Sequence, residues 1–215
     1  MKKNNMQNIV PAILTQGIAD MDEKIEELQE ATKWIHIDVM DGVFVPNTSF
    51  DLALWNSFPK DIDLEVHLMV DTPTAYFKDC ERIGAARVLV HAEASEDISA
   101  VLDEIKQYSF EKGIVLKADT ALDNLTVIAG RVDSVMLMSV VPGFQGQSFI
   151  PSSIERIKEV KKQFPDLLLG VDGGIDKTNI AEVFSAGADY TIIGSKIVKA
   201  ENPKDALRGF QDMIQ

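Results

Sequence analysis

The sequence predicts an α/β fold, a single (β/α)8 TIM barrel that takes up residues 1–215 as one domain. Short apolar runs rich in β-branched residues alternate with longer amphipathic stretches along the whole chain. This alternation is typical of repeated βα units around a parallel sheet. The 215 residues are near the lower limit for a complete barrel, and no Gly/Ser/Pro-rich linker divides them.

Eight strands are expected, and eight repeated units favour a closed barrel over an open sheet. The strands lie at residues 9–14, 34–39, 64–70, 88–91, 113–116, 134–138, 167–171 and 190–193. A helix is expected over residues 21–31, where Ile25, Leu28 and Gln29 form one stripe beside a glutamate-rich face.

Two further helices are indicated by capping signals. Thr72 and Pro73 are expected to be the N-cap and first residue of a helix that continues over residues 74–83. Asp176 is expected to cap the helix that follows the seventh strand.

Composition excludes several classes of partner. A formal charge of −13 argues against binding to nucleic acid or an anionic membrane, and no apolar stretch approaches the roughly 20 residues of a membrane-spanning helix. Cys80 is the only cysteine, which excludes an intrachain disulfide and a multi-thiolate zinc site. We therefore expect a soluble cytoplasmic protein, and the sequence leaves room for a homo-oligomer.

Polar residues at the ends of the predicted strands mark a candidate metal site. His36 and Asp38 are two residues apart and share one strand face, while His67 ends the third strand and Asp172 the seventh. In a TIM barrel such side chains meet at the carboxyl end of the sheet. Nitrogen and carboxylate ligands suit one divalent cation, which could be zinc, iron(II), manganese or cobalt.

A single strand histidine is more often a hydrogen-bonded core residue than a ligand, so this interpretation depends on the four residues together. His91 stays outside the ligand set, and its expected role is to orient a neighbour or to pack.

Glycines after the last three strands predict a phosphate site. Residues 142–147 follow the sixth strand, Gly173 and Gly174 the seventh, and Gly194 and Ser195 the eighth. Glycine lets the backbone approach an anion closely, and helix N-termini offer unpaired N–H groups. Any one of these sites alone is more often a tight turn, but three successive loops favour phosphate binding.

Five segments carry a family resemblance. They are HIDVMDGVFVPN at 36–47, VHLM at 66–69, HAEA at 91–94, MSVVPGFQGQSFI at 138–150 and VDGG at 171–174. With them the chain resembles the ribulose-phosphate 3-epimerases from the first strand to the eighth. The resemblance implies a barrel of the ribulose-phosphate-binding type and an isomerase that interconverts D-ribulose 5-phosphate and D-xylulose 5-phosphate in the pentose phosphate pathway.

The resemblance also implies residue roles. His36, Asp38, His67 and Asp172 match the metal ligands, and Asp38 and Asp172 also exchange protons with the substrate. The substrate and phosphate positions are His67, Gly143, Phe144, Gln145, Gly146, Gly173, Gly174, Gly194 and Ser195. Met40, Met69 and Met138 match methionines around the reacting carbon, although methionine is also an ordinary core filler.

The implied chemistry needs both aspartates. A metal on the carbonyl and hydroxyl oxygens stabilises the enediolate that remains when the proton beside the ketone is removed. One aspartate removes the proton from one face, and the other returns a proton to the opposite face.

Three departures from the family pattern leave the substrate open. Ala12 stands where serine is usual, Lys117 lies where the family has Asn-Pro, and Gln145 replaces a small residue. A 3-epimerase of a six-carbon ketose phosphate, such as D-allulose 6-phosphate, is the nearest alternative.

Two other functions are weaker alternatives. A related barrel decarboxylase would need an Asp-x-Lys-x-x-Asp array, which is missing, and Met69 stands where its lysine would be expected. A noncatalytic sugar-phosphate sensor would have no need of Asp38 and Asp172.

Overall fold

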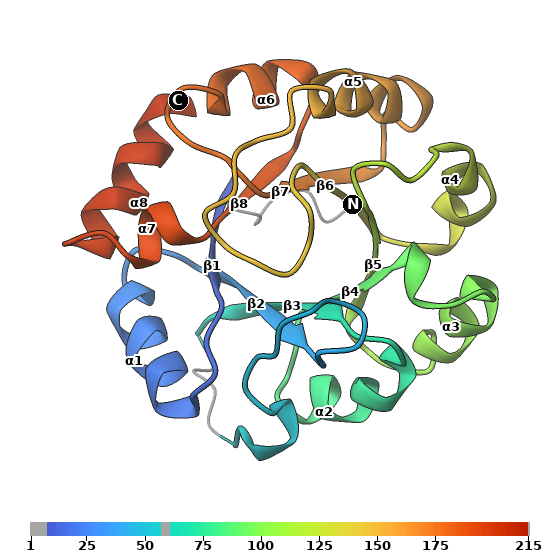
Figure 1. Cartoon of the computed structure of the whole chain (residues 1–215), viewed down its shortest axis with the longest axis horizontal. Helices are drawn as coiled ribbons and strands as arrows, with labels where there is room; N and C mark the ends of the chain where they lie inside the picture. Colours follow the sequence, from blue (N-terminus) through green and yellow to red (C-terminus); the bar gives the residue numbers. More distant parts are fainter. Residues whose placement is uncertain (1–7, 57–60, 215) are drawn as a thin grey trace.

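The computed structural model describes residues 8–56 and 61–214. The described chain forms a closed barrel of eight parallel strands, in which each strand pairs with its neighbours in sequence and β8 pairs with β1. Figure 1 shows the helices as a ring around this barrel. The fold class predicted from the sequence is confirmed, while residues 1–7, 57–60 and 215 of the expected domain lie outside the described residues.

The expected strands agree with the observed ones to within two residues at each end. The strands are β1 (Ile9–Ile13), β2 (Trp34–Met40), β3 (Asp63–Met69), β4 (Arg87–His91), β5 (Glu111–Leu116), β6 (Ser134–Met138), β7 (Leu168–Asp172) and β8 (Tyr190–Ile193). The α-helices are α1 (Ile18–Leu28), α2 (Phe77–Arg82), α3 (Ile98–Ile105), α4 (Asp123–Ile128), α5 (Ser153–Gln163), α6 (Ile180–Ala186), α7 (Ser195–Val198) and α8 (Pro203–Gln211).

Side chains alternate along each strand between the outer face of the barrel, which packs against the helices, and its inner face. On β3, Leu64, Val66 and Leu68 belong to the large core between the strands and the helices. Glu65 and His67 alternate with them and therefore face the interior of the barrel. The polar residues of the site thus lie on the inner face, and the outer face carries most of the hydrophobic packing.

The expected helix boundaries need correction. Helix α1 begins three residues before the expected start and ends at Leu28, and Gln29 is an exposed C-cap residue rather than part of the apolar stripe. Met21 takes its place there, since it is buried with Ile25 and Leu28. After Thr72, whose side chain makes no capping bond, Pro73 begins a 3-10 turn (Pro73–Tyr76) that precedes α2.

Asp176 does not cap helix α6. The residue at that cap position is Asn179, and the Asp176 carboxylate instead accepts hydrogen bonds from the backbone N–H (2.8 Å) and hydroxyl (2.5 Å) of Thr178. The side chain of Asn179 donates to the carbonyl of Gly174 (2.9 Å). This contact fixes the loop after β7 against the start of α6.

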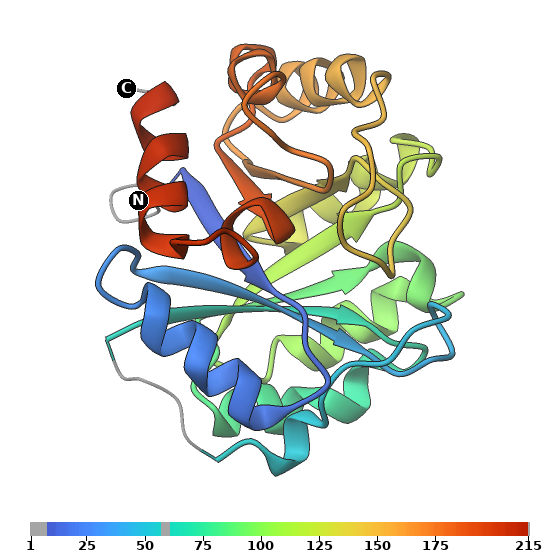
Figure 2. The ribbon, with the colours of Figure 1, turned by 60° about the vertical axis from the view of Figure 1, so that its left-hand side comes forward.

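Strand register determines which side chains become neighbours. On β2 and β3, His36 lies beside Glu65, Asp38 beside His67, and Met40 beside Met69. On β6 and β7, Met138 lies beside Asp172. Figure 2 gives a second view of the barrel and its loops. Among the described residues, no helix has both the length and the apolar character needed to cross a membrane.

Candidate active site at the carboxyl ends of the strands

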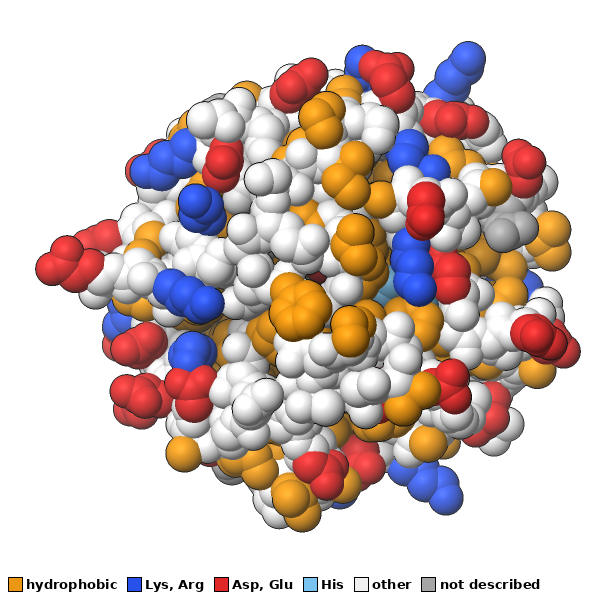
Figure 3. All heavy atoms as spheres, viewed as in Figure 1, with side chains coloured by type: hydrophobic (Ala, Val, Ile, Leu, Met, Phe, Trp, Pro, Cys, Tyr) orange, Lys and Arg blue, Asp and Glu red, His pale blue; other side chains and the backbone are white. Residues whose placement is uncertain are grey.

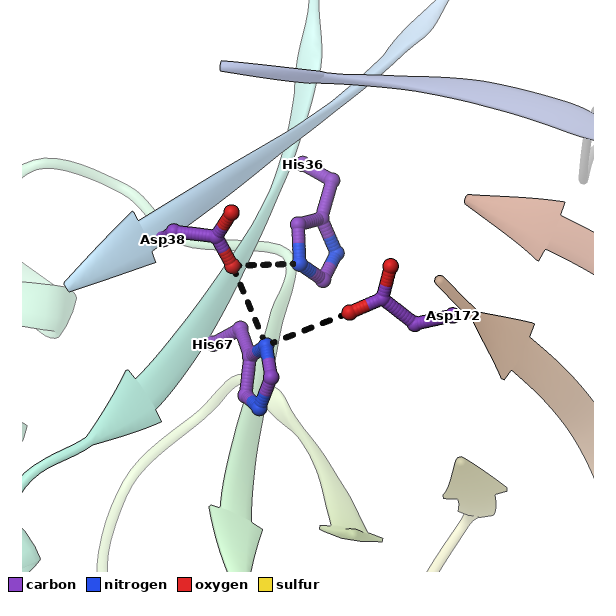
Figure 4. Close-up of side chains that lie close together, drawn as sticks. All are labelled: His36, Asp38, His67 and Asp172. Carbon is purple, nitrogen blue, oxygen red and sulfur yellow. Dashed lines mark hydrogen bonds and ion pairs between the residues drawn. The ribbon is translucent and has the colours of Figure 1, made fainter. Parts of the chain in front are cut away.

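Two histidines and two aspartates meet near the barrel axis, as the sequence predicts (Figure 4). One possible ligand atom from each of His36, Asp38, His67 and Asp172 lies within 4.8 Å of all the others. Oδ1 of Asp38 is 3.3 Å from Nε2 of His36 and 3.2 Å from Nδ1 of His67. Oδ2 of Asp172 is 3.8 Å from Nδ1 of His67. The buried cluster could hold a metal ion.

His67 is oriented through a second histidine. Nε2 of His67 is 2.9 Å from Nε2 of His91, and the Nδ1–H of His91 donates to Glu93 (3.1 Å). Burial, which outweighs the hydrogen bond to Glu93, lowers the pKa of His91 to about 4. A neutral His91 that donates through Nδ1 accepts through Nε2, so His67 donates to it from Nε2. The other nitrogen of His67 therefore faces the aspartates.

The two aspartates have opposite protonation tendencies. Burial alone would raise the pKa of Asp38, but hydrogen bonds from His36 and His67 hold it below its usual range. Burial raises the pKa of Asp172 to about 6, and the charge of Asp38 adds to this effect against the charges of the two histidines. A pair of carboxyl groups whose pKa values are pushed apart can divide the roles of base and acid.

The carboxylates beside His36 favour its protonated form. Burial alone would lower its pKa, but hydrogen bonds to Asp38 and Glu65, together with their charges, raise it to about 10. Glu65 lies directly behind His36, with Oε1 2.7 Å from Nδ1, and both side chains are fully buried. Sequence reasoning missed Glu65, although its place two residues before His67 on the same strand face was a usable signal.

A pocket of about 340 Å³ opens above the cluster. Its size is in the range of small-molecule sites. Asp38 and Asp172 lie in its wall, and the expected residues Gly143, Phe144, Gln145, Gly146, Gly173, Gly174, Gly194 and Ser195 also line it. Figure 3 shows hydrophobic side chains around the central opening, and a histidine is visible inside it. The two aspartates of the cluster and the predicted glycine loops therefore border one pocket, while His36 and His67 are fully buried and are not part of its lining.

The methionines and Ala12 also border the pocket. Met40, Met69 and Met138 are at most 5% exposed, so they present an apolar wall. Because Met40 and Met69 pack with Val45, they also belong to a small hydrophobic cluster.

The structure adds pocket residues that sequence reasoning did not select. Lys196, Thr178 and Asn179 line the side formed by the loops after β7 and β8. Lys196 is the one basic residue in the described lining, and its position next to Ser195 could have drawn attention. Asn47 lies in the segment after β2 and donates to the carbonyl of Gly143 (2.8 Å), which ties that segment to the glycine loop.

Ser139 holds the backbone beside Asp172. Its hydroxyl is 3.0 Å from the carbonyl oxygen of Asp172 and 2.6 Å from that of Gly173. Its own N–H donates to the Asp172 carbonyl (2.7 Å). The position of Asp172 at the end of β7 therefore depends on Ser139, which directly follows β6.

Solved structures of other enzymes share the barrel. A 3-hexulose-6-phosphate synthase from Salmonella typhimurium aligns with a TM-score of 0.75 over 97% of this chain and 98% of its own, at 12% identity. An orotidine 5'-phosphate decarboxylase from Pyrococcus horikoshii OT3 aligns with a TM-score of 0.66 over 96% and 98%, at 17% identity. At such low identity these likenesses show the fold alone.

Sequence comparisons go further. The profile described as the Ribulose-phosphate 3 epimerase family matches residues 8–198. A ribulose-phosphate 3-epimerase of Chlamydia pneumoniae is 36% identical over 211 residues, which cover 94% of this chain and 92% of that one. One of Bacillus subtilis (strain 168) is 35% identical over 210 residues, covering 94% and 97%. The chain therefore belongs to the ribulose-phosphate 3 epimerase family, whose members are isomerases acting on carbohydrates.

Proposed function

We propose that this protein interconverts D-ribulose 5-phosphate and D-xylulose 5-phosphate by moving a proton at C3, with the aid of one divalent cation. The observation that carries the proposal is one pocket that is lined both by the two aspartates of the His/Asp cluster and by the glycine loops. The cluster suits proton transfer and metal binding, and the loops suit a phosphate. The cytoplasmic location and the homo-oligomer remain predictions.

The donor set fits a divalent cation. His36 and His67 offer imidazole nitrogens, Asp38 and Asp172 offer carboxylate oxygens, and the four candidate atoms are close enough to surround one ion. This mixture suits zinc, iron(II), manganese or cobalt and is unlike the all-oxygen sites that calcium prefers. When bound, the ion would stabilise negative charge on the oxygens beside the reacting carbon.

Asp38 and Asp172 are proposed to exchange the proton. They approach His67 from β2 and β7, strands that are not neighbours in the barrel. A substrate held between them would present opposite faces of C3 to the two carboxyl groups. Asp38, which is held ionised, suits the base in one direction, and Asp172, which keeps its proton more readily, suits the acid. The roles exchange in the reverse reaction.

The loops after β6, β7 and β8 are proposed to hold the phosphate. Gly146 has a φ of +82° and Gly174 a φ of +66°, a backbone conformation that favours glycine. The side-chain amide Nε2 of Gln145 is buried and has no hydrogen-bond partner among the described residues. It lies at the pocket wall and supports a polar contact with the substrate.

Met40, Met69 and Met138 are proposed to exclude water from the reacting carbon, because their buried side chains line the same pocket. Water exclusion protects an enediolate from protonation by solvent.

Proton exchange with solvent tests the proposal. Metal-loaded protein in deuterium oxide should introduce deuterium at C3 of ribulose 5-phosphate while xylulose 5-phosphate forms. If D-allulose 6-phosphate exchanges faster than ribulose 5-phosphate, the six-carbon sugar phosphate is the preferred substrate. Binding of both sugars without exchange would contradict epimerisation and favour the noncatalytic sensor.

A further inference from the structure

A buried polar network lies beneath the His/Asp cluster and contacts it through the carboxylate of Glu65. Oε1 of Glu65 is 2.7 Å from Nδ1 of His36. Oε2 of Glu65 accepts from Nη1 of Arg87 (2.8 Å) and from the hydroxyl of Tyr190 (3.0 Å). Both carboxylate oxygens of Glu65 are thus occupied, and its side chain is fully buried.

The contacts of Glu65 make it a hydrogen-bond acceptor. The guanidinium of Arg87, which stays charged, forms an ion pair with the carboxylate at 2.8 Å, and the hydroxyl of Tyr190 donates to the same oxygen. Arg87 is itself held by Glu111, whose Oε2 accepts from Nη2 (2.7 Å) and Nε (3.2 Å). Its guanidinium also lies over the rings of Trp34 (4.8 Å) and Tyr190 (5.4 Å).

Strand register and one glycine build this arrangement. The backbone pairs His36 with Glu65, Glu65 with Arg87, and Arg87 with Glu111 across four consecutive strands. Gly170 on β7 leaves the space for Tyr190, because a Cβ there would lie 2.5 Å from Cζ of the tyrosine ring. The whole layer is therefore assembled by the fold around Glu65.

We propose that Glu65 is a positioning residue that keeps a proton on Nδ1 of His36, so that Nε2 is the nitrogen that gives up its proton and binds the metal. An ionised carboxylate only accepts hydrogen bonds, so Nδ1 must be the donor in the 2.7 Å contact. Nε2 then faces Asp38 at 3.3 Å, inside the ligand cluster. The inference rests on the metal site of the proposed function.

The buried carboxylate of Glu65 has a function at this position. A carboxylate behind a ligating imidazole fixes the tautomer and the ring orientation and makes the nitrogen a stronger ligand, and its loss typically weakens metal binding about 10- to 100-fold. Glu65 does not line the pocket, whereas Asp38 and Met40 do, so it is not placed to touch a bound substrate. Glu65 therefore acts through His36.

Nitrogen-15 NMR of the metal-free protein tests the proton position directly. The sequence has only three histidines, so the six ring nitrogens can be assigned with single His→Asn variants. We expect a strongly hydrogen-bonded Nδ1–H for His36 in the wild type, and its loss or weakening in Glu65→Leu. A wild-type His36 with a bare Nδ1 would overturn the inference whatever the activity of the enzyme.

Zinc affinity provides the second readout, with Val66→Ala as the matched control. Val66 is on the same strand but faces the helices, so its truncation costs stability without touching His36. We expect zinc affinity to fall about 10- to 100-fold in Glu65→Leu, less in Glu65→Gln, which retains an acceptor oxygen, and hardly at all in Val66→Ala.

The outcomes separate the two proposals. A wild-type protein that binds no divalent cation would overturn the proposed metal site, and the positioning role with it. A wild type that binds zinc and epimerises, together with a folded Glu65→Leu that binds zinc as tightly as Val66→Ala does, would overturn the role of Glu65 alone. If Glu65→Leu does not fold, a wild-type His36 with a bare Nδ1 in the NMR experiment has the same consequence.

Discussion

The two sides of the pocket bind by different means. On the side of β2 and β3, buried ionisable side chains on rigid strands lie at hydrogen-bonding distances from one another. On the side of the loops after β6, β7 and β8, glycines and backbone groups dominate the lining. On the first side, a change in the charge or protonation state of one side chain should abolish metal binding or proton transfer. The second should respond mainly to changes in shape, because its proposed ligand contacts come from the backbone.

The aspartates should give the largest effect. We expect Asp38→Asn and Asp172→Asn each to lower kcat by about 10²- to 10⁴-fold, because an amide can neither remove nor return the C3 proton. Turnover and deuterium incorporation at C3 should fall together. Circular dichroism and thermal unfolding provide the check on folding, and near wild-type turnover in either folded variant would refute the two-aspartate assignment.

Metal binding should depend steeply on pH, because the proposed ligands on the ionisable side of the pocket hold protons that the metal must displace. In the metal-free protein His36 has a pKa of about 10 and Asp172 a pKa of about 6, and the protons that they hold must leave when the metal binds. Affinity should therefore fall as the pH falls, by roughly a hundredfold between pH 8 and 6, where His36 releases one proton.

Below about pH 6 the dependence should steepen, because Asp172 then also holds a proton. Isothermal titration with zinc at several pH values measures the slope. Asp172→Asn is the matched variant, since it should lose the additional steepness and keep the slope due to His36. A flat profile in the wild type would mean that these groups do not ligate the ion.

Shape should matter more than charge on the loop side. Gly174→Ala would place a Cβ 2.4 Å from the backbone nitrogen of Phe149 at a φ of +66°, so the loop after β6 must move. We expect KM to rise about 10- to 100-fold, since displacements of this size are costly for positioning. Zinc affinity should stay unchanged, because none of the four proposed ligands is displaced.

Gly130→Ala is the control for this prediction. A Cβ at Gly130 would meet no atom within 4 Å, and its φ is not positive. It should leave KM unchanged. A wild-type KM in folded Gly174→Ala, or an equal loss of zinc affinity in that variant, would contradict the division of the pocket into two sides.

The same division explains what could be predicted from the sequence. His36, Asp38, His67 and Asp172 were identifiable because strand alternation and the carboxyl-end rule place inward-facing polar residues together. Glu65 obeys the same alternation, but its partner Tyr190 is far away in sequence and becomes a neighbour only when the barrel closes. The contact between Glu65 and Tyr190 therefore depends on closure of the barrel and is not visible in the local sequence pattern.

Loop detail was less predictable for a different reason. The glycine positions were visible in the sequence, but the direction that a side chain would take from Gly174 depends on where the loop after β6 folds back. Asp176 likewise had the right residue type for a cap, and a competing turn with Thr178 took its carboxylate. Local side-chain hydrogen bonds of this kind compete with helix capping.

The smallest expected effect tests whether any side chain contributes on the loop side. The buried amide Nε2 of Gln145 has no partner among the described residues, and a Cβ at Gly194 would lie 2.8 Å from it. If the substrate accepts a hydrogen bond from this amide, Gln145→Ala should raise KM by about 2- to 13-fold, which corresponds to a net hydrogen bond of about 0.5–1.5 kcal/mol. The value of kcat should hardly change, because the amide is not among the proton-transferring groups.

Gln163→Ala is the matched control for Gln145→Ala, since Gln163 is an exposed residue of α5 whose side-chain amide donates to Glu159 (3.2 Å) on the same helix. Steady-state kinetics on both variants, with ribulose 5-phosphate as substrate, gives the comparison. Equal KM values in the two variants would show that the loops hold the phosphate through backbone groups alone, which would sharpen the contrast with the ionisable side. A large fall in kcat for Gln145→Ala would instead show that the loop side takes part in proton transfer, and the contrast would fail.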